Sequence, residues 1–256
     1  MSEQSDRDDL ATKGFANGSL YNSARPSYPV AAIDYFVSAL KLHHTSRALD
    51  LGAGTGIFSR QILPFVGELT AVDPSASMRE AMKAESAGIE VLDGSDVSIP
   101  LADASIDVVF VAQAFHWFDA PRALAEIHRV LRPEGGLGLI WNERDESVGW
   151  VRELNRAMRW DTQQPYEVGR DFSGAIAAGP FTSIERVRCT HEQTLTREGL
   201  YQRVLTTSYI SIMDQRRRDQ LMSDVRKVVE RLSEPLTVPY VTDVYSARAL
   251  PTVPTG

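Results

Sequence analysis

The sequence predicts an α/β fold built on a doubly wound, mostly parallel sheet of seven strands. Short apolar runs alternate with amphipathic segments between residues 46 and 141, which is typical of strand–helix–strand units. The run at 105–113 has a continuous apolar centre, as expected of a strand that is buried on both faces. Because connections between parallel strands are right-handed, this alternation predicts a doubly wound topology.

The first half of the chain contains the predicted core of the sheet. Five strands are expected there, at residues 47–52, 68–73, 88–94, 105–113 and 136–142. Helical periodicity predicts one helix before the first strand and three between the strands, at residues 29–40, 55–66, 75–84 and 121–131. Pro64 interrupts the second helix, and the Arg-Pro-Glu-Gly-Gly segment at 132–136 is expected to end the fourth.

The second half is less regular and contains the predicted insertions. Helices are expected at 146–160, at about 197–212 and at 215–232, and strands that extend the sheet at 181–195 and 236–250. We therefore expect a single domain with a disordered tail, N-terminal lid helices, a ligand-binding core and two insertions that cap the carboxyl edge of the sheet. These parts correspond to residues 1–9, 10–45, 46–141, 142–180 and 196–233.

Composition and charge narrow the classes of function. Of the 256 residues, 43% are hydrophobic and 24% charged, as in globular proteins, and the net charge is −7. This acidity disfavours a nucleic-acid partner, because binding to a phosphate backbone depends on Lys and Arg. No apolar run approaches the roughly 18 residues of a membrane span, and the polar, acidic N-terminus is unlike a leader. We expect a cytoplasmic protein with a small-molecule substrate and no membrane partner, and the sequence predicts no particular oligomeric state.

Cysteine and histidine predict neither a nucleophile nor a metal site. Cys189 is the only cysteine, so no internal disulfide can form, and it has no CxxC partner. The five histidines have no spacing to Cys, Asp or Glu that is typical of metal ligands. We therefore predict no metal.

A glycine-rich turn after the first strand carries the main functional signal. In Asp50-Leu51-Gly52-Ala53-Gly54-Thr55-Gly56 the glycines alternate, so the backbone can turn tightly and a ligand can approach it. The spacing is GxGxG, whereas dinucleotide-binding proteins have GxGxxG, and the leading Asp50 suits an ammonium group and repels a pyrophosphate. Asp73 ends the second strand, where a carboxylate can accept both ribose hydroxyls. Together these features predict S-adenosylmethionine as the ligand.

Four segments resemble the sequential motifs of class I S-adenosylmethionine-dependent methyltransferases. They are ALDLGAGTG, TAVDPSASM, VLDGSDVSIPLADASIDVVFV and HRVLRPEGGLGLIWN, within about residues 46–141. YNSARPSYP, AQAFHWFD, IWNERD and VPYVTDVYSAR resemble more narrowly a small-molecule branch that includes trans-aconitate and fungal thiol methyltransferase-like enzymes. The resemblance implies a Rossmann-like fold and S-adenosylmethionine as cofactor, with S-adenosylhomocysteine as its product.

The resemblance also implies roles for individual residues. Asp50 would hold the cofactor's ammonium group, directly or through water, Asp73 would bind the ribose, and Arg25 would face the carboxylate. Further implied cofactor contacts are Tyr21, Gly52, Ala53, Gly54, Gly56, Pro74, Met78, Ser95, Asp96, Ala112 and Gln113. The implied acceptor pocket consists of Tyr21, His116, Trp117, Trp141 and Arg144.

Several of these residues also have a purely structural interpretation. Met78 can be packing at the start of a helix, and Arg25 can be a solvated charge in a loop. Trp141 and Arg144 can anchor the helix that follows the fifth strand instead of shaping a pocket.

One departure from the family pattern leaves the adenine contact open. The family more often has an acidic residue directly after the glycine that follows the third strand. Here Ser95 takes that place and Asp96 follows it, so either side chain can reach the adenine amino group.

The predicted reaction is an in-line displacement, in which the protein mainly holds the nucleophile and the methyl carbon in line. An oxygen, sulfur, nitrogen or carbon nucleophile can serve, and a carboxylate or thiol is favoured because neither needs a strong base. His116 is a candidate base for a protonated acceptor, a wall of the pocket, or local packing. The alternatives to a methyltransferase are a nicotinamide-dependent oxidoreductase and a catalytically silent S-adenosylmethionine-binding protein.

Overall fold

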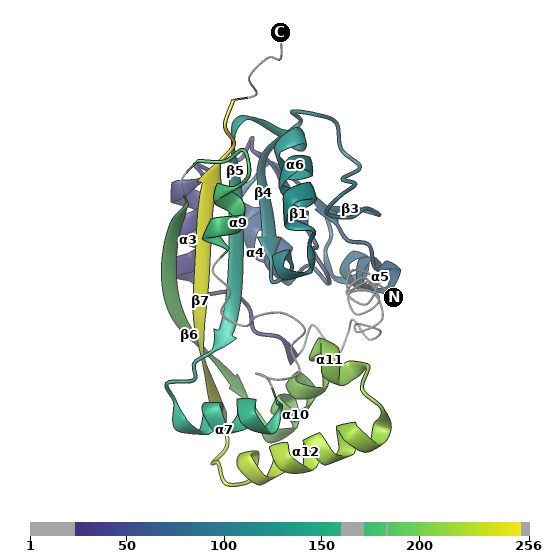
Figure 1. Cartoon of the computed structure of the whole chain (residues 1–256), viewed down its shortest axis with the longest axis vertical. Helices are drawn as coiled ribbons and strands as arrows, with labels where there is room; N and C mark the ends of the chain where they lie inside the picture. Colours follow the sequence, from purple (N-terminus) through teal and green to yellow (C-terminus); the bar gives the residue numbers. More distant parts are fainter. Residues whose placement is uncertain (1–23, 160–171, 183, 252–256) are drawn as a thin grey trace. The chain divides into compact units, whose positions relative to one another are not determined.

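A computed structural model of the chain describes residues 24–159, 172–182 and 184–251 (Figure 1). Over these residues the sheet has seven strands in the order β3-β2-β1-β4-β5-β7-β6. The pairs β1–β2, β2–β3, β1–β4 and β4–β5 are parallel, which confirms the predicted doubly wound, mostly parallel α/β fold. The strands are β1 (Arg47–Leu51), β2 (Glu68–Val72), β3 (Glu90–Leu92), β4 (Ile106–Ala112), β5 (Leu131–Arg144), β6 (Glu185–Leu195) and β7 (Leu236–Arg248).

The helices of the first half precede or connect the strands. They are α3 (Val30–Ala39), α4 (Ile57–Ile62), η1 (Leu63–Phe65), α5 (Ala76–Glu85), η2 (Phe115–Trp117) and α6 (Ala120–Val130). The described helices of the second half are α7 (Gly149–Ala157), α9 (Ser173–Ala177), α10 (Arg197–Leu205), α11 (Ser208–Ser211) and α12 (Gln215–Val229). Local signals begin several of them: the side chain of Asp214, for example, accepts the N–H of Arg217 at 3.0 Å at the start of α12.

The central strands are buried on both faces. Leu49 and Leu51 of β1 pack in one apolar cluster with residues of α6, whereas Ala48 packs in a second cluster with residues of α3 and α4. Val109 and Phe110 of β4 divide between the same two clusters. This is the two-residue period of a strand, and it explains why the run at 105–113 is apolar throughout.

The sheet changes its direction of winding beside β1. Strands β2 and β3 lie on one side of β1, and β4 and β5 lie on the other. Asp50 pairs in register with Ala71 of β2 and with Phe110 of β4. The turn at 52–56 therefore begins at the topological switch point, where ligands bind in sheets of this kind.

Two boundaries differ from the sequence prediction. β5 begins at Leu131 and includes residues 132–136, because Leu131 pairs with Ile106 and an irregular register carries the pairing onward. The predicted helix at 197–212 is divided into α10 and α11. The division occurs because Thr207 leaves the helical conformation, with φ −71° and ψ 131°, and becomes the N-cap residue of α11.

The chain divides into two compact units, which are described separately below. The helical unit has its own apolar core, in which side chains of α7, α10, α11 and α12 pack with the first residues of β7. The sheet unit contains the two clusters around β1 and β4. Among the described residues, the sheet unit comprises 27–141, 172–189 without 183, and 242–251, and the helical unit comprises 24–26, 142–159 and 190–241.

Three expectations from the sequence, on membrane spans, metal sites and the single cysteine, can be compared with the described residues. No helix within them has the length and apolarity that crossing a membrane requires. No group of three His, Cys, Asp or Glu side chains in these ranges is placed to hold a metal ion. Cys189 is half-buried, and burial raises the pKa of its thiol, which is the opposite of what activates a nucleophilic cysteine.

Candidate cofactor site

The glycine turn after β1 requires glycine at its alternate positions. Gly52, Gly54 and Gly56 have φ values of 72°, 56° and 78°, in the left-handed region. A Cβ added at Gly52 would lie 2.7 Å from the Cβ of Ala114, so the turn lies directly against the segment after β4. A Cβ added at Gly54 would meet no described atom within 4 Å, so there is open space in front of this part of the turn.

Asp73 joins the end of β2 to the glycine turn. Its Oδ2 accepts the N–H of Gly54 at 2.8 Å, and its Oδ1 accepts the N–H of Ser75 at 2.8 Å. The side chain is buried, and burial raises the pKa of this carboxyl more than the two N–H donors lower it. Because each carboxylate oxygen has a further lone pair, Asp73 can accept two hydroxyls without giving up these bonds.

Asp50 is wholly buried at the end of β1 and is only partly hydrogen-bonded. Its Oδ2 accepts the hydroxyl of Ser59 on α4, whereas its Oδ1 has no hydrogen-bond partner among the described residues. Burial raises the pKa of Asp50 to about 7; the Ser59 hydrogen bond opposes this shift, and the Asp73 carboxyl adds to it. A buried carboxylate oxygen without a donor is costly, so Asp50 can gain from one more cationic or hydrogen-bonding partner.

These three features fit the cofactor that the sequence predicts. The open space at Gly54, the unpartnered Oδ1 of Asp50 and the remaining lone pairs of Asp73 are complementary to a ligand with an ammonium group and two ribose hydroxyls. The two buried carboxylates would repel a pyrophosphate.

The loop after β3 carries the two candidates for the adenine contact. Ser95 and Ser98 form an isolated bridge, in which the two N–O distances are 3.1 and 3.2 Å. The Oδ2 of Asp96 accepts the N–H of Asp119 at 3.0 Å, which ties the loop to the residue before α6. Both candidates therefore lie in a loop with fixed backbone contacts, and the choice between them stays a prediction.

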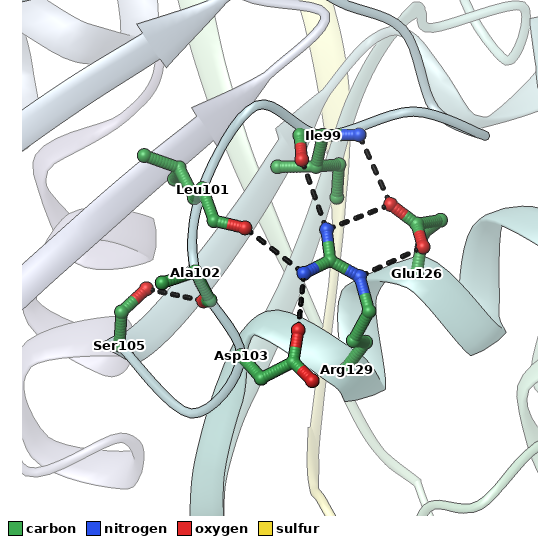
Figure 2. A network of polar contacts seen from close by, with 7 residues as sticks. All are labelled: Ile99, Leu101, Ala102, Asp103, Ser105, Glu126 and Arg129. Atoms are coloured by element: carbon green, nitrogen blue, oxygen red, sulfur yellow. Dashed lines mark hydrogen bonds and ion pairs between the residues drawn. The ribbon is translucent and has the colours of Figure 1, made fainter.

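A network centred on Arg129 of α6 holds the following part of the same loop (Figure 2). Its guanidinium donates to the carbonyls of Ile99 and Leu101 at 2.9 Å each, and to the carboxylates of Asp103 and Glu126. Glu126 also accepts the N–H of Ile99 at 3.0 Å, and the hydrogen bond from Arg129 holds the pKa of Glu126 below its usual value. All three nitrogens of Arg129 thus have acceptors, and the network holds the loop to α6.

Three further predicted cofactor contacts differ in exposure. Met78, on α5, is 2% exposed, which packing alone explains, and its contact with adenine stays a prediction. Pro74 is exposed at the start of the loop that leads to α5. Ala53 is half-buried and packs against an apolar cluster formed by Ala71, Met82 and Val91.

The end of β4 carries a strained residue that the sequence did not reveal. Ala112 ends the strand half-buried, and Gln113 follows it with a φ of 57°, which is uncommon for a residue with a side chain. The N–H of Gln113 donates to the carbonyl of Ile140 at 3.0 Å, so pairing with β5 holds this conformation. Such strained positions cluster at functional sites, but glutamine carries no local signal for a left-handed backbone.

His116 and Trp117 lie in η2, and Trp141 lies in β5. The Nε1–H of Trp141 donates to the Nδ1 of His116 over 3.5 Å, which is a long hydrogen bond. The ring centroids of His116 and Trp117 are 5.0 Å apart. A neutral imidazole that accepts through Nδ1 carries its proton on Nε2, so its one lone pair is already engaged. Among the three interpretations of His116, this geometry favours a wall of the pocket.

Trp141 is mainly part of the core. Its side chain is 8% exposed and stacks on Phe172 with ring centroids 4.4 Å apart. Tyr245 packs edge-on against both rings. The structural interpretation of Trp141 therefore accounts for most of its surface, and its indole N–H is the part that faces His116.

The remaining predicted site residues are not part of the sheet unit. Tyr21 lies outside the described residues. Arg25 belongs to the helical unit and is half-buried, where its Nη2 donates to the carbonyl of Thr206 at 2.8 Å. Arg144 is buried in the same unit, and its Nε donates to the Oδ1 of Asn155 on α7 at 2.5 Å. Arg144 thus anchors the helix after β5, which is one of its two predicted roles.

The fold and the site define a class I S-adenosylmethionine-dependent methyltransferase. The methyltransferase domain family matches residues 49–139, which contain the end of β1, the glycine turn and β2 to β4. An uncharacterized methyltransferase of Mycobacterium tuberculosis is 37% identical to this chain over 245 residues, which are 92% of this chain and 95% of that protein. The chain therefore belongs to the methyltransferase family.

A second relative and a solved structure agree with this assignment. A methyltransferase-like protein of Schizosaccharomyces pombe is 30% identical over 238 residues, which are 90% of this chain and 93% of that protein. A solved structure described as a type II methyltransferase, from Anaeromyxobacter dehalogenans, superposes with a TM-score of 0.67 at 24% identity and covers 89% of this chain and 99% of its own. The structural likeness supports the fold, and family membership sets aside the nicotinamide-dependent oxidoreductase.

Proposed function

We propose that this chain transfers the methyl group of S-adenosylmethionine to a small-molecule acceptor by in-line displacement, with a carboxylate or thiol as the favoured nucleophile. The observation that carries the proposal is the pair of buried carboxylates at the switch point, Asp50 with its unpartnered Oδ1 and Asp73 bonded to Gly54. A ligand with an ammonium group, ribose hydroxyls and no phosphate is complementary to both. The narrower sequence resemblance, to trans-aconitate and fungal thiol methyltransferase-like enzymes, supports a small acceptor.

The residues of the chain contribute binding and orientation. Bound S-adenosylmethionine supplies a methyl carbon on a positively charged sulfur, which is a good leaving group. Asp50 binds the ammonium group through Oδ1, Asp73 accepts the ribose hydroxyls, and the left-handed turn at 52–56 keeps the two carboxylates in place. Holding the reacting groups in line can supply several kcal/mol of the lowered barrier.

The favoured nucleophile follows from the hydrogen bonding of His116. With Nδ1 accepting the long hydrogen bond from Trp141, the lone pair of the neutral ring is engaged, which makes His116 a weaker candidate for removing a proton. A carboxylate is already ionised at neutral pH and needs no base, and a thiol needs only a modest lowering of its pKa.

One relative bears on the choice of acceptor atom. A malonyl-[acyl-carrier protein] O-methyltransferase of Pectobacterium atrosepticum is 36% identical over 100 residues, which are 39% of this chain and 40% of that protein. Its name supports an oxygen nucleophile among those that the reaction can use.

The proposal is tested with purified protein, S-adenosylmethionine and a panel of carboxylic acids, thiols, phenols and amines. S-adenosylhomocysteine release is measured by mass spectrometry, and we expect it with at least one acid or thiol. The matched control is Asp73→Asn, which removes the ribose acceptor while its amide oxygen can still accept one backbone N–H. This variant should lose affinity for S-adenosylhomocysteine in calorimetry and lose turnover with it.

Two outcomes would contradict the proposal. Binding of S-adenosylhomocysteine without turnover on any acceptor would make the chain a binding protein that is catalytically silent. Turnover confined to phenols or amines, with a rate that rises with pH through the pKa of a histidine, would restore His116 as a base and remove the preference for a carboxylate or thiol.

A further inference from the structure

The helical unit contains buried cations that the cofactor site of the sheet unit does not use. Arg203, on α10, is 5% exposed, and Arg144, at the end of β5, is 8% exposed. Burial lowers the pKa of Arg144 to about 10, and the charge of Arg203 is the next cause of this shift. The charge of Arg25 lowers the same pKa, and Arg25 bonds to the carbonyl of Thr206. These guanidinium groups therefore lie close enough to repel one another.

Arg203 and Thr207 contain buried polar atoms that lack partners. The Nε and Nη1 atoms of Arg203 have no hydrogen-bond acceptor among the described residues. The hydroxyl of Thr207, a residue that is 4% exposed, also has no partner among them. Thr207 follows Arg203 by four residues, at the junction between α10 and α11, so the two groups lie near one another along the chain.

Other arginines of the helical unit have evident structural roles. Arg218, on α12, donates from Nη2 to the carbonyl of Met213 at 2.5 Å. Arg197, at the start of α10, donates from Nη2 to the carbonyl of Leu232 at 2.6 Å. Both arginines thus tie segments of backbone together, although the Nε of each also lacks a partner among the described residues. Arg203 differs from them in lacking an acceptor at two nitrogens, Nε and Nη1, and in being buried.

An opposite charge would relieve the repulsion in this cluster. Besides the two arginines, the groups that shift the pKa of Arg144 most are the side chains of Tyr240 and Tyr209, and neither is a carboxylate. The Tyr209 hydroxyl donates to the carbonyl of Met158 at 2.8 Å, and that of Tyr240 donates to the Oε1 of Gln193 at 3.2 Å. Arginine stays protonated when buried, and the Nε and Nη1 atoms of Arg203 have no acceptor among the described residues, so Arg203 is complementary to an oxyanion.

We propose that Arg203, Thr207 and Arg144 form a binding site for an oxyanion, which is a carboxylate or phosphate group of a small anionic metabolite other than the cofactor. The site is inferred from the helical unit alone. A guanidinium offers parallel N–H donors that match two oxygens of a carboxylate or phosphate, and the threonine hydroxyl adds a third donor.

The site is tested by titrating the protein with citrate and, separately, with inorganic phosphate in a calorimeter. We expect at least one of these anions to bind the wild type, and Arg203→Met to raise its Kd about tenfold or more. Thr207→Val should raise the Kd less, and Arg203→Lys should keep part of the affinity because it keeps the charge. Arg216→Met is the matched control, since it removes the same charge from an exposed position on α12 of the same unit. Near-ultraviolet circular dichroism verifies that each variant is folded.

Equal affinity of the wild type and Arg203→Met for each anion would overturn the site, as would equal losses in Arg203→Met and Arg216→Met. The citrate and phosphate titrations also distinguish a carboxylate from a phosphate ligand. S-adenosylhomocysteine should bind Arg203→Met as tightly as the wild type, and a tenfold loss there would overturn the proposal that the site takes an anion other than the cofactor.

Discussion

The sheet unit and the helical unit each bury a charged group with unpartnered atoms, and these two groups have charges of opposite sign. In the sheet unit this group is Asp50, whose Oδ1 has no donor, and in the helical unit it is Arg203, whose Nε and Nη1 have no acceptor among the described residues. Arg129 of the sheet unit is the contrast, because it is only half-buried and all three of its nitrogens have acceptors. A buried charge with unpartnered atoms is therefore a candidate for binding a ligand, whereas Arg129 holds a loop to a helix.

The largest effect should come from breaking the satisfied network. Arg129→Met removes the donor of the Leu101 carbonyl and leaves the Ile99 carbonyl and the Glu126 carboxylate with one backbone donor each, so we expect it to lower the free energy of unfolding by about 2–4 kcal/mol. Urea denaturation measures the change. Arg132→Met, which removes an exposed ion pair with Asp107, is the control and should cost about 0–1 kcal/mol. Equal costs for the two variants would contradict the structural role assigned to Arg129.

The unsatisfied carboxylate of the sheet unit should respond to pH. Because the pKa of Asp50 is raised to about 7 in the ligand-free protein, Asp50 is protonated below that pH and must ionise to bind an ammonium group. Affinity for S-adenosylhomocysteine should therefore fall as the pH drops from 7.5 toward 5.5, by up to about tenfold per unit. Calorimetry in buffers of different ionisation enthalpy should also detect release of a proton on binding.

Asp50→Asn isolates this effect and tests its cost in stability. The variant should bind S-adenosylhomocysteine about tenfold or more weakly at pH 7.5, with an affinity that varies less with pH. A folded-state pKa above the unfolded value means that ionised Asp50 destabilises the ligand-free protein above pH 7, and that this cost disappears as the pH falls toward 4. The variant should therefore unfold at higher urea concentration at pH 8 and not at pH 4. An unchanged pH dependence of binding would contradict the role of Asp50.

The unsatisfied guanidinium of the helical unit should behave in the opposite way to Arg129. Arg203→Met removes a buried charge that repels Arg144, so we expect the ligand-free protein to gain about 1 kcal/mol of stability. Thermal and urea unfolding in a buffer without multivalent anions measure this gain. A loss as large as that of Arg129→Met would mean that Arg203 stabilises the fold, and the comparison between the two units would then be wrong.

The smallest effect is expected at His116, which has a hydrogen-bond partner in Trp141. His116→Ala should keep the affinity for S-adenosylhomocysteine and lower turnover about tenfold. Loss of a general base typically lowers turnover more, by roughly 10²–10⁴-fold. Turnover of the variant and of the wild type is compared from pH 5.5 to 8.5 with an acceptor found in the panel. A large loss that follows the protonation of a histidine would identify a base, and near wild-type turnover at every pH would remove that interpretation altogether.

The order of strands and helices could be predicted because it is encoded locally. Apolar periods of two and 3.6 residues, together with prolines and glycines at their ends, predict the elements between β1 and β4. The prediction was wrong at 132–136, where pairing with β4 extends β5, and at 197–212, where Thr207 begins a second helix. In both places the outcome depends on hydrogen bonds that the local pattern does not contain.

Part of the candidate site was also accessible from the sequence. The alternating glycines and Asp73 stand at fixed distances along the chain, and a parallel sheet brings the ends of β1 and β2 to one edge. The hydrogen bond from Gly54 to Asp73 follows from that arrangement. Gln113 could be placed at the site by resemblance, but its left-handed backbone is imposed by pairing with β5.

The sequence by itself determined the fold class, the glycine turn and the identity of the acidic residues around it. Only the tertiary structure decided that Asp50 is wholly buried with one oxygen unpartnered, and that Arg203 lies beside Arg144 without an acceptor for two of its nitrogens. The physical reason is that backbone propensity depends on residues that are neighbours in the chain. The desolvation of a charge depends on segments that meet only when the chain has folded.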